Sequence, residues 1–321
     1  MKRIGVFTSG GDAPGMNAAI RSVVRTAVHS GLEVRGIYRG YSGLIEGEIG
    51  PMQAHSVSNI IQHGGTILKT DRSEEFRTKE GRDKAAEVIR HNEIDALVAI
   101  GGDGTFRGAA ALEEETGIPV VGVPGTIDND VAGTDFTIGF DTAVNTALES
   151  IDKIRDTAYS FERTFFVEVM GRASGFIATE VALASGAEYV IIPELETDFD
   201  ELSRRLLAAR PTKRSNIVIV AEGEITGGAI KIAERLNELH NIQYRICILG
   251  HVQRGGSPSA YDRILASVLG IEAVKCLQAG ISGVMVGQVD HTVVITPFHE
   301  TFEKKKLVNL DYVKQLGILA K

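Results

Sequence analysis

The chain has 321 residues, of which 43% are hydrophobic, and its 42 acidic against 34 basic residues leave a net charge of −8. This length and apolar content suffice for about two domains with substantial cores. The negative charge argues against non-specific binding to nucleic acid or to a membrane surface, although a local basic cluster can still bind an anion.

The cysteines and the N-terminus restrict the protein class further. Cys247 and Cys276 lie in apolar surroundings without CxxC or Cys/His spacing. This pattern favours buried, reduced thiols over a disulfide framework or a zinc site. Met1-Lys2-Arg3 is followed by too short an apolar run for a signal peptide, and no run has the length of a membrane span. We therefore expect a cytoplasmic protein.

Short, β-branched apolar runs alternate with longer segments of helical periodicity along the chain. The predicted strands are 3–8, 33–38, 95–101, 118–123, 163–170, 188–193, 216–222, 245–250 and 284–288. The predicted helices are 15–30, 80–92, 105–116, 140–158, 173–186, 199–210, 228–240, 258–279 and 303–315. This alternation predicts an α/β protein with mainly parallel sheets that helices cover on both faces.

So many strands exceed one compact sheet, and we expect two Rossmann-like three-layer α/β/α lobes with the active site in the cleft between them. The expected crossings lie near Ile138-Gly139 and near residues 251–256. The larger lobe would comprise residues 1–138 plus 252–302, and the smaller lobe residues 139–251 plus 303–321.

Three predicted strands end in loops that combine glycine with aspartate. Residues 8–12 (TSGGD), 101–105 (GGDGT) and 124–130 (PGTIDND) follow the strands 3–8, 95–101 and 118–123. Open α/β sheets place their chemistry at the carboxyl ends of strands. The three loops therefore predict one site that holds phosphates and a metal.

Each loop also has a simpler interpretation. Gly10-Gly11 can bind a phosphate through its amides or merely form a tight turn. Asp103 is a candidate Mg²⁺ ligand, but Asp103 or Thr105 can instead be a helix N-cap. Asp128 and Asp130 suit phosphoryl transfer to an alcohol, where one carboxylate accepts the alcohol proton. An Asx turn explains one of these aspartates more readily than both.

Together with these loops, Met170-Gly171-Arg172 and residues 249–256 (LGHVQRGG) resemble the bacterial ATP-dependent 6-phosphofructokinases. The resemblance runs in order from residue 1 to about 290 and fades in the C-terminal segment. It implies transfer of the γ-phosphoryl of MgATP to the 1-hydroxyl of fructose 6-phosphate. It also implies a homotetramer with active sites shared between subunits, in which the larger lobe binds ATP and the smaller lobe binds the sugar phosphate.

The resemblance assigns roles residue by residue. Asp128 would be the general base and Asp103 the Mg²⁺ ligand, while Arg172 would offset charge on the moving phosphoryl group. Thr126 and Asp130 would complete the transfer site. The residues expected to line the ATP site are Gly11, Arg72, Ser73, Gly102, Asp103, Gly104 and Thr105.

The sugar phosphate would be held by residues from several segments. They are Thr126, Ile127, Asp128, Met170, Gly171, Arg172, Glu222, His251 and Arg254. Of these, His251 and Arg254 would grip the 6-phosphate, and Arg163 and Arg245 would reach that phosphate from a neighbouring subunit. The guanidinium fork suits phosphate oxygens. Taken alone, Arg163 is more simply a surface arginine before a strand.

A second, regulatory site is also implied. Arg21 and Arg25 share one face of the predicted helix 15–30, where a solvated basic face is the alternative. By resemblance they bind an effector, ADP as activator or phosphoenolpyruvate as inhibitor, and Arg155, Glu188, Lys213 and Arg214 complete the site. Pro211 and Ala54 stand where relatives carry charge, and we expect a weakened or altered effector response.

Other departures concern the active site. Pyrophosphate-dependent relatives carry Asp and Lys at the positions of Gly104 and Gly125, so these glycines predict ATP as the donor. Phe176 replaces an aspartate, and we expect it one helical turn from Arg172, where it would alter the orientation of that side chain. The residues before Arg72, Lys69-Thr70-Asp71, differ from the family pattern as well.

Four alternative functions were weighed against these residues. A pyrophosphate-dependent phosphofructokinase conflicts with the two glycines, and a lipid or NAD kinase conflicts with the phosphate grip of His251 and Arg254. A catalytically silent sugar-phosphate sensor conflicts with the retained carboxylates. A dinucleotide oxidoreductase would need a G-x-G-x-x-G after the first strand with an acidic residue downstream, which this chain lacks.

Overall fold

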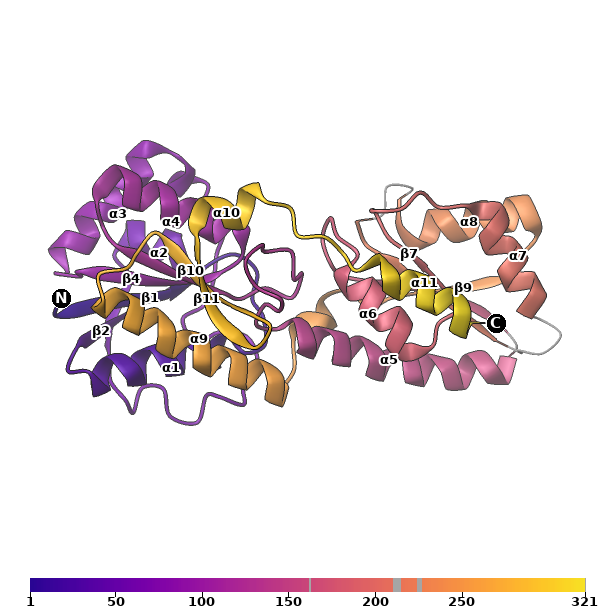
Figure 1. Ribbon diagram of the computed structural model, residues 1–321, viewed down its shortest axis with the longest axis horizontal. Coiled ribbons are helices and arrows are strands. Elements are labelled where there is room, and N and C mark those ends of the chain that lie inside the picture. Colours follow the sequence, from indigo (N-terminus) through magenta and orange to yellow (C-terminus); the bar gives the residue numbers. More distant parts are fainter. Residues whose placement is uncertain (162, 210–214, 224–226, 321) are drawn as a thin grey trace. The chain divides into compact units, whose positions relative to one another are not determined.

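The computed structural model describes residues 1–161, 163–209, 215–223 and 227–320. The chain divides into two compact units (Figure 1). Unit 1 comprises Met1–Thr142 and Arg254–Lys306, and unit 2 comprises Ala143–Gln253 and the chain from Leu307 onward.

Unit 1 is built on a seven-stranded sheet in the order β11-β10-β5-β4-β1-β2-β3. All neighbours are parallel except the pairs β2–β3 and β10–β11, which are antiparallel. The strands are β1 (Arg3–Thr8), β2 (Glu33–Ile37), β3 (Ile49–Met52), β4 (Ala96–Gly101), β5 (Val120–Pro124), β10 (Val284–Val289) and β11 (Thr292–Pro297). Every residue of the central strands β4 and β5 is buried, which explains their continuous apolar sequence.

Helices cover both faces of this sheet. On one face α1 (Met16–His29) packs against α9 (Ala260–Gln278), as Figure 1 shows. The other face carries α2 (Gly40–Glu46), α3 (Lys79–His91), α4 (Asp103–Thr116) and α10 (Phe298–Glu303). There the rings of Phe106 and Phe298 stack with centroids 5.5 Å apart. The 3-10 helix η1 (Glu75–Arg77) precedes α3.

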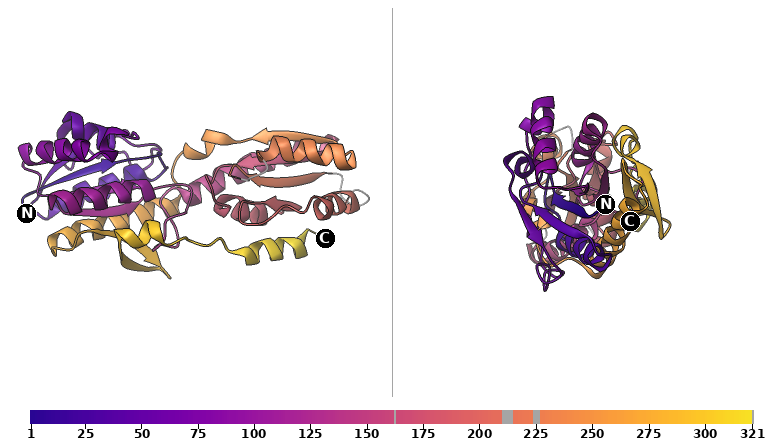
Figure 2. Two further views of the ribbon diagram at one scale, coloured as in Figure 1. Left: turned by 90° about the horizontal axis from the view of Figure 1, so that it is seen from above. Right: turned by 90° about the vertical axis from the view of Figure 1, so that its left-hand side faces the viewer.

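Unit 2 has a four-stranded parallel sheet in the order β7-β8-β6-β9. Its strands are β6 (Thr164–Val169), β7 (Tyr189–Ile191), β8 (Asn216–Ala221) and β9 (Tyr244–Ile248). One face is covered by α7 (Phe199–Ala209) and α8 (Gly228–His240), whose apolar sides form the core with β6 and β8. The helices α6 (Phe176–Ser185) and α11 (Leu310–Leu319) pack together, and Figure 2 shows α8 and α11 on opposite sides of this sheet.

Two elements pass from one unit to the other: α5 (Phe140–Phe161) begins in unit 1, and η2 (Gly250–Arg254) ends there. The structure confirms the α/β class with mainly parallel sheets. No helix in the described parts of the chain is long and apolar enough to cross a membrane.

Some predicted elements are wrong. The expected helix 303–315 is two helices, because α10 ends at Glu303 and Asn309 starts α11 by accepting a hydrogen bond from the Asp311 amide at 3.1 Å. The expected helix 173–186 begins only at Phe176, because residues 171–174 form a turn that the Ser174 amide closes by donating to the Gly171 carbonyl at 3.0 Å, and Gly175 is the N-cap residue. The elements α2, β3 and β11 were not predicted.

Candidate active site

The structure brings the three glycine-aspartate loops to one edge of the unit 1 sheet. They follow β1, β4 and β5, which are neighbours in the strand order. The Ser9 amide donates to the Ile100 carbonyl at 3.0 Å, and the Gly125 amide donates to the Gly101 carbonyl at 2.9 Å. Backbone hydrogen bonds therefore tie the first and third loops to the end of β4, where the GGDGT loop begins.

The GGDGT loop opens α4. Gly102 is the N-cap residue and makes no side-chain cap, so the interpretation of Asp103 or Thr105 as an N-cap is wrong. Thr105 instead donates its hydroxyl to the Ser9 carbonyl at 3.1 Å, and its carbonyl accepts from the buried Tyr41 hydroxyl at 2.6 Å. The side chain of Asp103 is 30% exposed, 3.8 Å from Nε of Arg107. An accessible carboxylate thus stands beside the positive end of a helix dipole, which attracts anions.

The turn after β5 carries the candidate base. Thr126, Asp128 and Asn129 are all buried there. Oγ1 of Thr126 accepts a hydrogen bond from the Asp128 amide at 3.2 Å, and the Thr126 carbonyl accepts one from the Thr137 hydroxyl at 2.6 Å. A Cβ placed on Gly102 would lie 3.6 Å from Cβ of Thr126. The carboxylate turn and the GGDGT loop are therefore in contact.

A guanidinium lies over the first glycine loop. Nη1 of Arg254 donates to the Asp12 carbonyl at 3.0 Å, and a Cβ on Gly11 would lie 2.5 Å from that nitrogen. A Cβ at position 11 would therefore displace the flexible end of the Arg254 side chain from this loop. Arg254 belongs to unit 1, whereas His251, its expected partner on the 6-phosphate, belongs to unit 2 and is exposed.

The segment that departs from the family pattern before Arg72 packs against the same glycine loop. The hydroxyl of Thr70 donates to the Gly10 carbonyl at 2.8 Å, and the Gly10 amide donates to the Asp71 carbonyl at 3.3 Å. Arg72 is exposed, and Oγ of Ser73 accepts from the Phe76 amide at 3.2 Å. The altered residues thus keep Arg72 and Ser73 next to the first glycine loop.

Gly104 and Gly125, the two glycines from which we predict ATP as the donor, have different surroundings. A Cβ on Gly104 would meet no atom within 4 Å, so this position faces open space. A Cβ on Gly125 would meet Ile100 at 3.0 Å and Met16 at 3.3 Å, which are core residues. A side chain at position 125 would therefore point into the core, which does not support the expectation that a lysine there fills the nucleotide's space. A side chain at position 104 would point into open space, as the expected choice of ATP over pyrophosphate requires.

In unit 2, the expected sugar-binding residues gather at the ends of β6 and β8. The Met170 amide donates to Oε1 of Gln253 at 2.9 Å, and the Arg172 amide donates to Oε1 of Glu222 at 2.8 Å. A Cβ on Gly223 would lie 1.9 Å from the Arg172 carbonyl oxygen, so only glycine permits this approach. The turn of Met170, Gly171 and Arg172 after β6 is therefore held against Glu222, which follows β8.

The expected relation between Phe176 and Arg172 is wrong. Arg172 lies in the turn before α6 with left-handed backbone, and it is not one helical turn from Phe176. Phe176 is the first residue of α6 and is buried, whereas Arg172 is exposed. The aromatic ring therefore adds to the core of unit 2.

Arg163 and Arg245 lie close together on one edge of unit 2. Arg163 directly precedes β6, and Arg245 on the edge strand β9 is opposite Phe165 of β6. Because side chains alternate between the two faces of a sheet, positions 163, 165 and 245 share one face. The guanidinium of Arg163 lies 4.9 Å from the ring centroid of Phe161, and Nη1 of Arg245 donates to the Tyr244 carbonyl at 2.8 Å. Arg245 is exposed and Arg163 is half-buried.

The expected effector residues are divided between the units. Arg21 and Arg25 lie on α1 in unit 1. In unit 2, Arg155 donates to the Ser185 carbonyl at 2.7 Å, and the buried Glu188 accepts from the Ile217 amide at 2.5 Å. Pro211, Lys213 and Arg214 lie outside the described residues.

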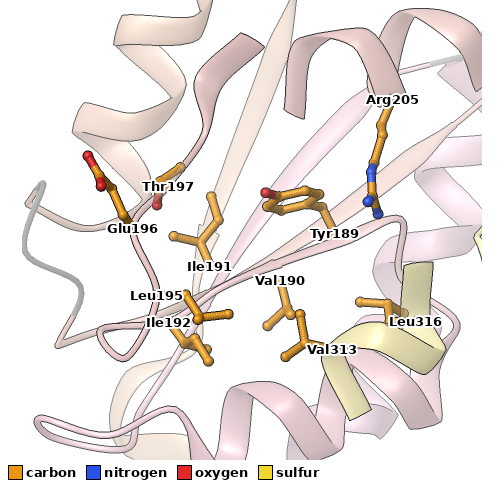
Figure 3. A pocket seen from close by; sticks show the side chains of 10 residues that line it. All are labelled: Tyr189, Val190, Ile191, Ile192, Leu195, Glu196, Thr197, Arg205, Val313 and Leu316. Atoms are coloured by element: carbon orange, nitrogen blue, oxygen red, sulfur yellow. The ribbon is translucent and has the colours of Figure 1, made fainter. Parts of the chain in front are cut away.

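A pocket of about 100 Å³ in unit 2 is separate from all of these residues (Figure 3). Tyr189, Ile191 and Leu195 line it together with Arg205 from α7 and Leu316 from α11. Nε of Arg205 already donates to Glu201 at 2.7 Å, and its guanidinium lies 5.4 Å from the Tyr189 ring centroid. None of the predicted catalytic or substrate residues lines this pocket, so it is not the candidate site.

Two residues near the turn after β5 were not singled out from the sequence. Oδ1 of Asn129, between the two aspartates, accepts from the Thr137 amide at 3.0 Å and from Nζ of Lys306 at 2.8 Å. The position of Asn129 in the DND sequence was a usable signal. Lys306 lies in a lysine run far along the chain, and no sequence pattern connects it to the turn.

Comparisons with known proteins identify the family of this chain. The phosphofructokinase family model matches residues 3–277. The ATP-dependent 6-phosphofructokinase 1 of Thermus thermophilus is 59% identical over 321 residues, covering 100% of both chains. The ATP-dependent 6-phosphofructokinase 2 of Bacteroides thetaiotaomicron is 54% identical over 100% of this chain and 99% of its own.

Solved structures show the same fold. Phosphofructokinase from Saccharomyces cerevisiae superposes with a TM-score of 0.88 at 38% identity, covering 94% of this chain and 45% of the yeast chain. A pyrophosphate-dependent phosphofructokinase from Marinobacter aquaeolei has a TM-score of 0.85 at 23% identity, covering 99% of this chain and 88% of its own, and shares the fold. With a family model over most of its length and full-length relatives above half identity, this chain belongs to the phosphofructokinase family.

Proposed function

We propose that this protein is an ATP-dependent 6-phosphofructokinase. It transfers the γ-phosphoryl group of ATP to the 1-hydroxyl of D-fructose 6-phosphate and gives fructose 1,6-bisphosphate and ADP, the committed step of glycolysis. The observation that carries the proposal is the contact between the buried Asp128 turn and the GGDGT loop that opens α4. The full-length relatives named ATP-dependent 6-phosphofructokinase support it.

The ATP phosphates would lie on the glycine loops of unit 1, the larger lobe. The amides at the start of α4 and the Gly10-Gly11 loop offer donors to phosphate oxygens, and open space at Gly104 leaves room for the nucleotide. Arg72 and Ser73 lie beside the same loop, which Thr70 ties in place.

The donor set fits Mg²⁺. The described residues contain no group of three or more His, Cys, Asp or Glu placed to hold a metal. Mg²⁺ needs no such group, since it binds through one or two carboxylates together with phosphate oxygens and water. The accessible carboxylate of Asp103 would hold it. When bound, the ion would neutralise charge on the β- and γ-phosphates.

Asp128 would act as the general base and accept the proton of the 1-hydroxyl as the oxygen attacks phosphorus. Its amide is tied to Oγ1 of Thr126, which limits the directions that the carboxylate can take. Thr126 and Asp130 would complete the transfer site. The exposed Arg172 would offset the charge that develops on the moving phosphoryl group.

The sugar phosphate would be held mainly by unit 2, the smaller lobe, through the turn of Met170, Gly171, Arg172 and Glu222. Ile127, His251 and Arg254 would add contacts to it. Arg163 and Arg245, which register places on one face of the neighbouring segments, would serve the active site of a neighbouring subunit in a homotetramer. The guanidinium fork matches phosphate oxygens, which supports this use of two arginines.

Arg21, Arg25, Arg155 and Glu188 would belong to an effector site for ADP or phosphoenolpyruvate. Arg155 and Glu188 are already held by backbone groups, which keeps them in defined positions. Ala54 is exposed and uncharged, so the site would lack a cation there.

The deciding experiment measures phosphorylation of fructose 6-phosphate by MgATP and by Mg-pyrophosphate in parallel. We expect activity with ATP alone. Activity with pyrophosphate would retain the fold and reject the donor. Inactivity of well-folded protein with both donors would instead favour a catalytically silent sugar-phosphate sensor.

A further inference from the structure

Asn129 determines the shape of the turn between the two candidate catalytic carboxylates. Its backbone is left-handed (φ 53°), a conformation that asparagine tolerates better than most residues. Its side chain closes the loop: Oδ1 accepts from the Thr137 amide at 3.0 Å, and Nδ2 donates to the Asp135 carbonyl at 3.2 Å. The Asn129 side chain thus joins the start of the 128–137 loop to its end.

Lys306 reaches the same two acceptors from the far end of the chain. Its Nζ donates to Oδ1 of Asn129 at 2.8 Å and to the Asp135 carbonyl at 2.7 Å. It bridges the two ends of the loop that the Asn129 side chain closes. The bonds come from a cation, and charge-assisted hydrogen bonds are stronger than neutral ones.

The start of this lysine segment is itself anchored in unit 1. Phe298 of α10 is buried against Phe106 of α4, and the Thr301 carbonyl accepts a hydrogen bond from the Ala132 amide at 3.3 Å. The 128–137 loop is therefore attached to α10 at Ala132 and to Lys306 at Asn129 and Asp135. Burial lowers the pKa of Lys306 to about 8, while the carboxylates of Asp135 and Asp130 oppose that change.

We propose that Lys306 is a positioning residue for phosphoryl transfer, which holds the Asp128-Asn129-Asp130 turn through Oδ1 of Asn129 and the Asp135 carbonyl. This inference rests on the proposed kinase function. Lys306 acts through the turn and not on the substrate. Its loss lets the base move relative to the hydroxyl, and small misplacements of reacting groups cost rate more than affinity.

The test compares Lys306→Met with Lys306→Arg, using Lys305→Met, an exposed neighbour, as the matched control. Wild-type activity with ATP is measured first, so that failure of the proposed function is recognised separately. In Lys306→Met we expect kcat to fall at least about tenfold with both KM values within about threefold of wild type. Lys306→Arg should recover most of the rate, and Lys305→Met should match wild type.

A double-mutant cycle with Asn129→Ala provides an independent measurement. If both residues act through one bond, the double variant should lose little more kcat than the worse single variant. Normal kcat in Lys306→Met, or independent multiplication of the two effects, would overturn the proposal. The proposal would also be overturned if Lys306→Met changed thermal stability, both KM values and kcat together and Lys306→Arg restored none of them.

Discussion

Asp262, on the first turn of α9, caps the N-terminus of α5 through Thr142. Oδ2 of Asp262 accepts from the Thr142 amide at 2.8 Å and from its hydroxyl at 2.5 Å, and Oδ1 accepts from the Gly139 amide at 2.8 Å. A side chain 120 residues away thus satisfies donors that a local N-cap residue usually satisfies. Asp262 is fully buried, and α5 passes from unit 1 to unit 2 directly after Thr142.

The stability of this cap should depend on pH. Burial raises the pKa of Asp262 to about 6, although its hydrogen-bond donors favour the carboxylate. Because the folded-state pKa is raised, the protonated acid favours folding. This stabilisation is complete below the unfolded pKa near 4 and is lost as pH rises through about 6. The free energy of unfolding that is lost over this range is at most about 3 kcal/mol.

Asp262→Asn removes this titration, so we expect its melting temperature relative to wild type to improve between pH 4.5 and about 6.5 and then to level off. The amide cannot accept all three bonds, so the variant should be less stable than wild type at the acidic end. Thermal unfolding across that pH range measures both effects. A constant difference between the two proteins would show that Asp262 does not titrate there.

Asp128→Ser tests the general base. We expect kcat to fall at least about a hundredfold with little change in either KM, because the base acts on a proton in transit. Steady-state kinetics with fructose 6-phosphate and MgATP measure this. Thr137→Val, which removes the bond to the Thr126 carbonyl, is a control for general loosening of the turn. Near-normal turnover in Asp128→Ser would exclude it as the base.

Gly104→Asp and Gly125→Ala separate donor specificity from packing. Gly104 faces open space, so its aspartate variant should fold normally but raise the KM for ATP at least about tenfold, since a carboxylate repels the nucleotide phosphates. Gly125→Ala presses on Ile100 and Met16, so it should mainly lower the melting temperature. Unchanged ATP affinity in Gly104→Asp would reject the space argument at that position.

Arg163→Ala should raise the half-saturation concentration for fructose 6-phosphate far more than that for ATP, and Arg245→Ala should do the same. Both arginines present their side chains on one face of the edge of unit 2. Arg235→Ala, which removes a surface arginine stacked on Phe199 at 4.4 Å, is the matched control. Equal effects on both substrates would argue against arginines that bind the 6-phosphate.

Effector response should be weak. Ala54 and Pro211 supply no charge to an anion, and proline also lacks an N–H. We expect ADP to lower the half-saturation concentration for fructose 6-phosphate less than threefold, on the order of 1 kcal/mol of coupling or less. Arg25→Ala should abolish the remaining effect. Strong ADP activation in wild type would contradict this expectation.

The sequence alone determined most of the strands and most of the long helices. Runs such as Ala96–Gly101 are apolar throughout because both faces of the sheet are covered, and that pattern is visible without coordinates. The motifs also predicted that the three loops lie together, and the strand order β5-β4-β1 places them side by side as a candidate site. Edge strands such as β3 and β11 escaped prediction, because β3 (IGPM) contains glycine and proline and β11 (TVVITP) has only three consecutive apolar residues between threonines.

Only the tertiary structure decided which distant residues complete these loops. Asp262 caps α5, Arg254 covers Gly11 and Lys306 holds Asn129, and each contact joins residues more than 100 positions apart. It likewise decided that Gly125 faces the core while Gly104 faces open space. Periodicity and turn chemistry depend on neighbouring residues, whereas such contacts depend on how whole layers pack, and no local pattern contains that information.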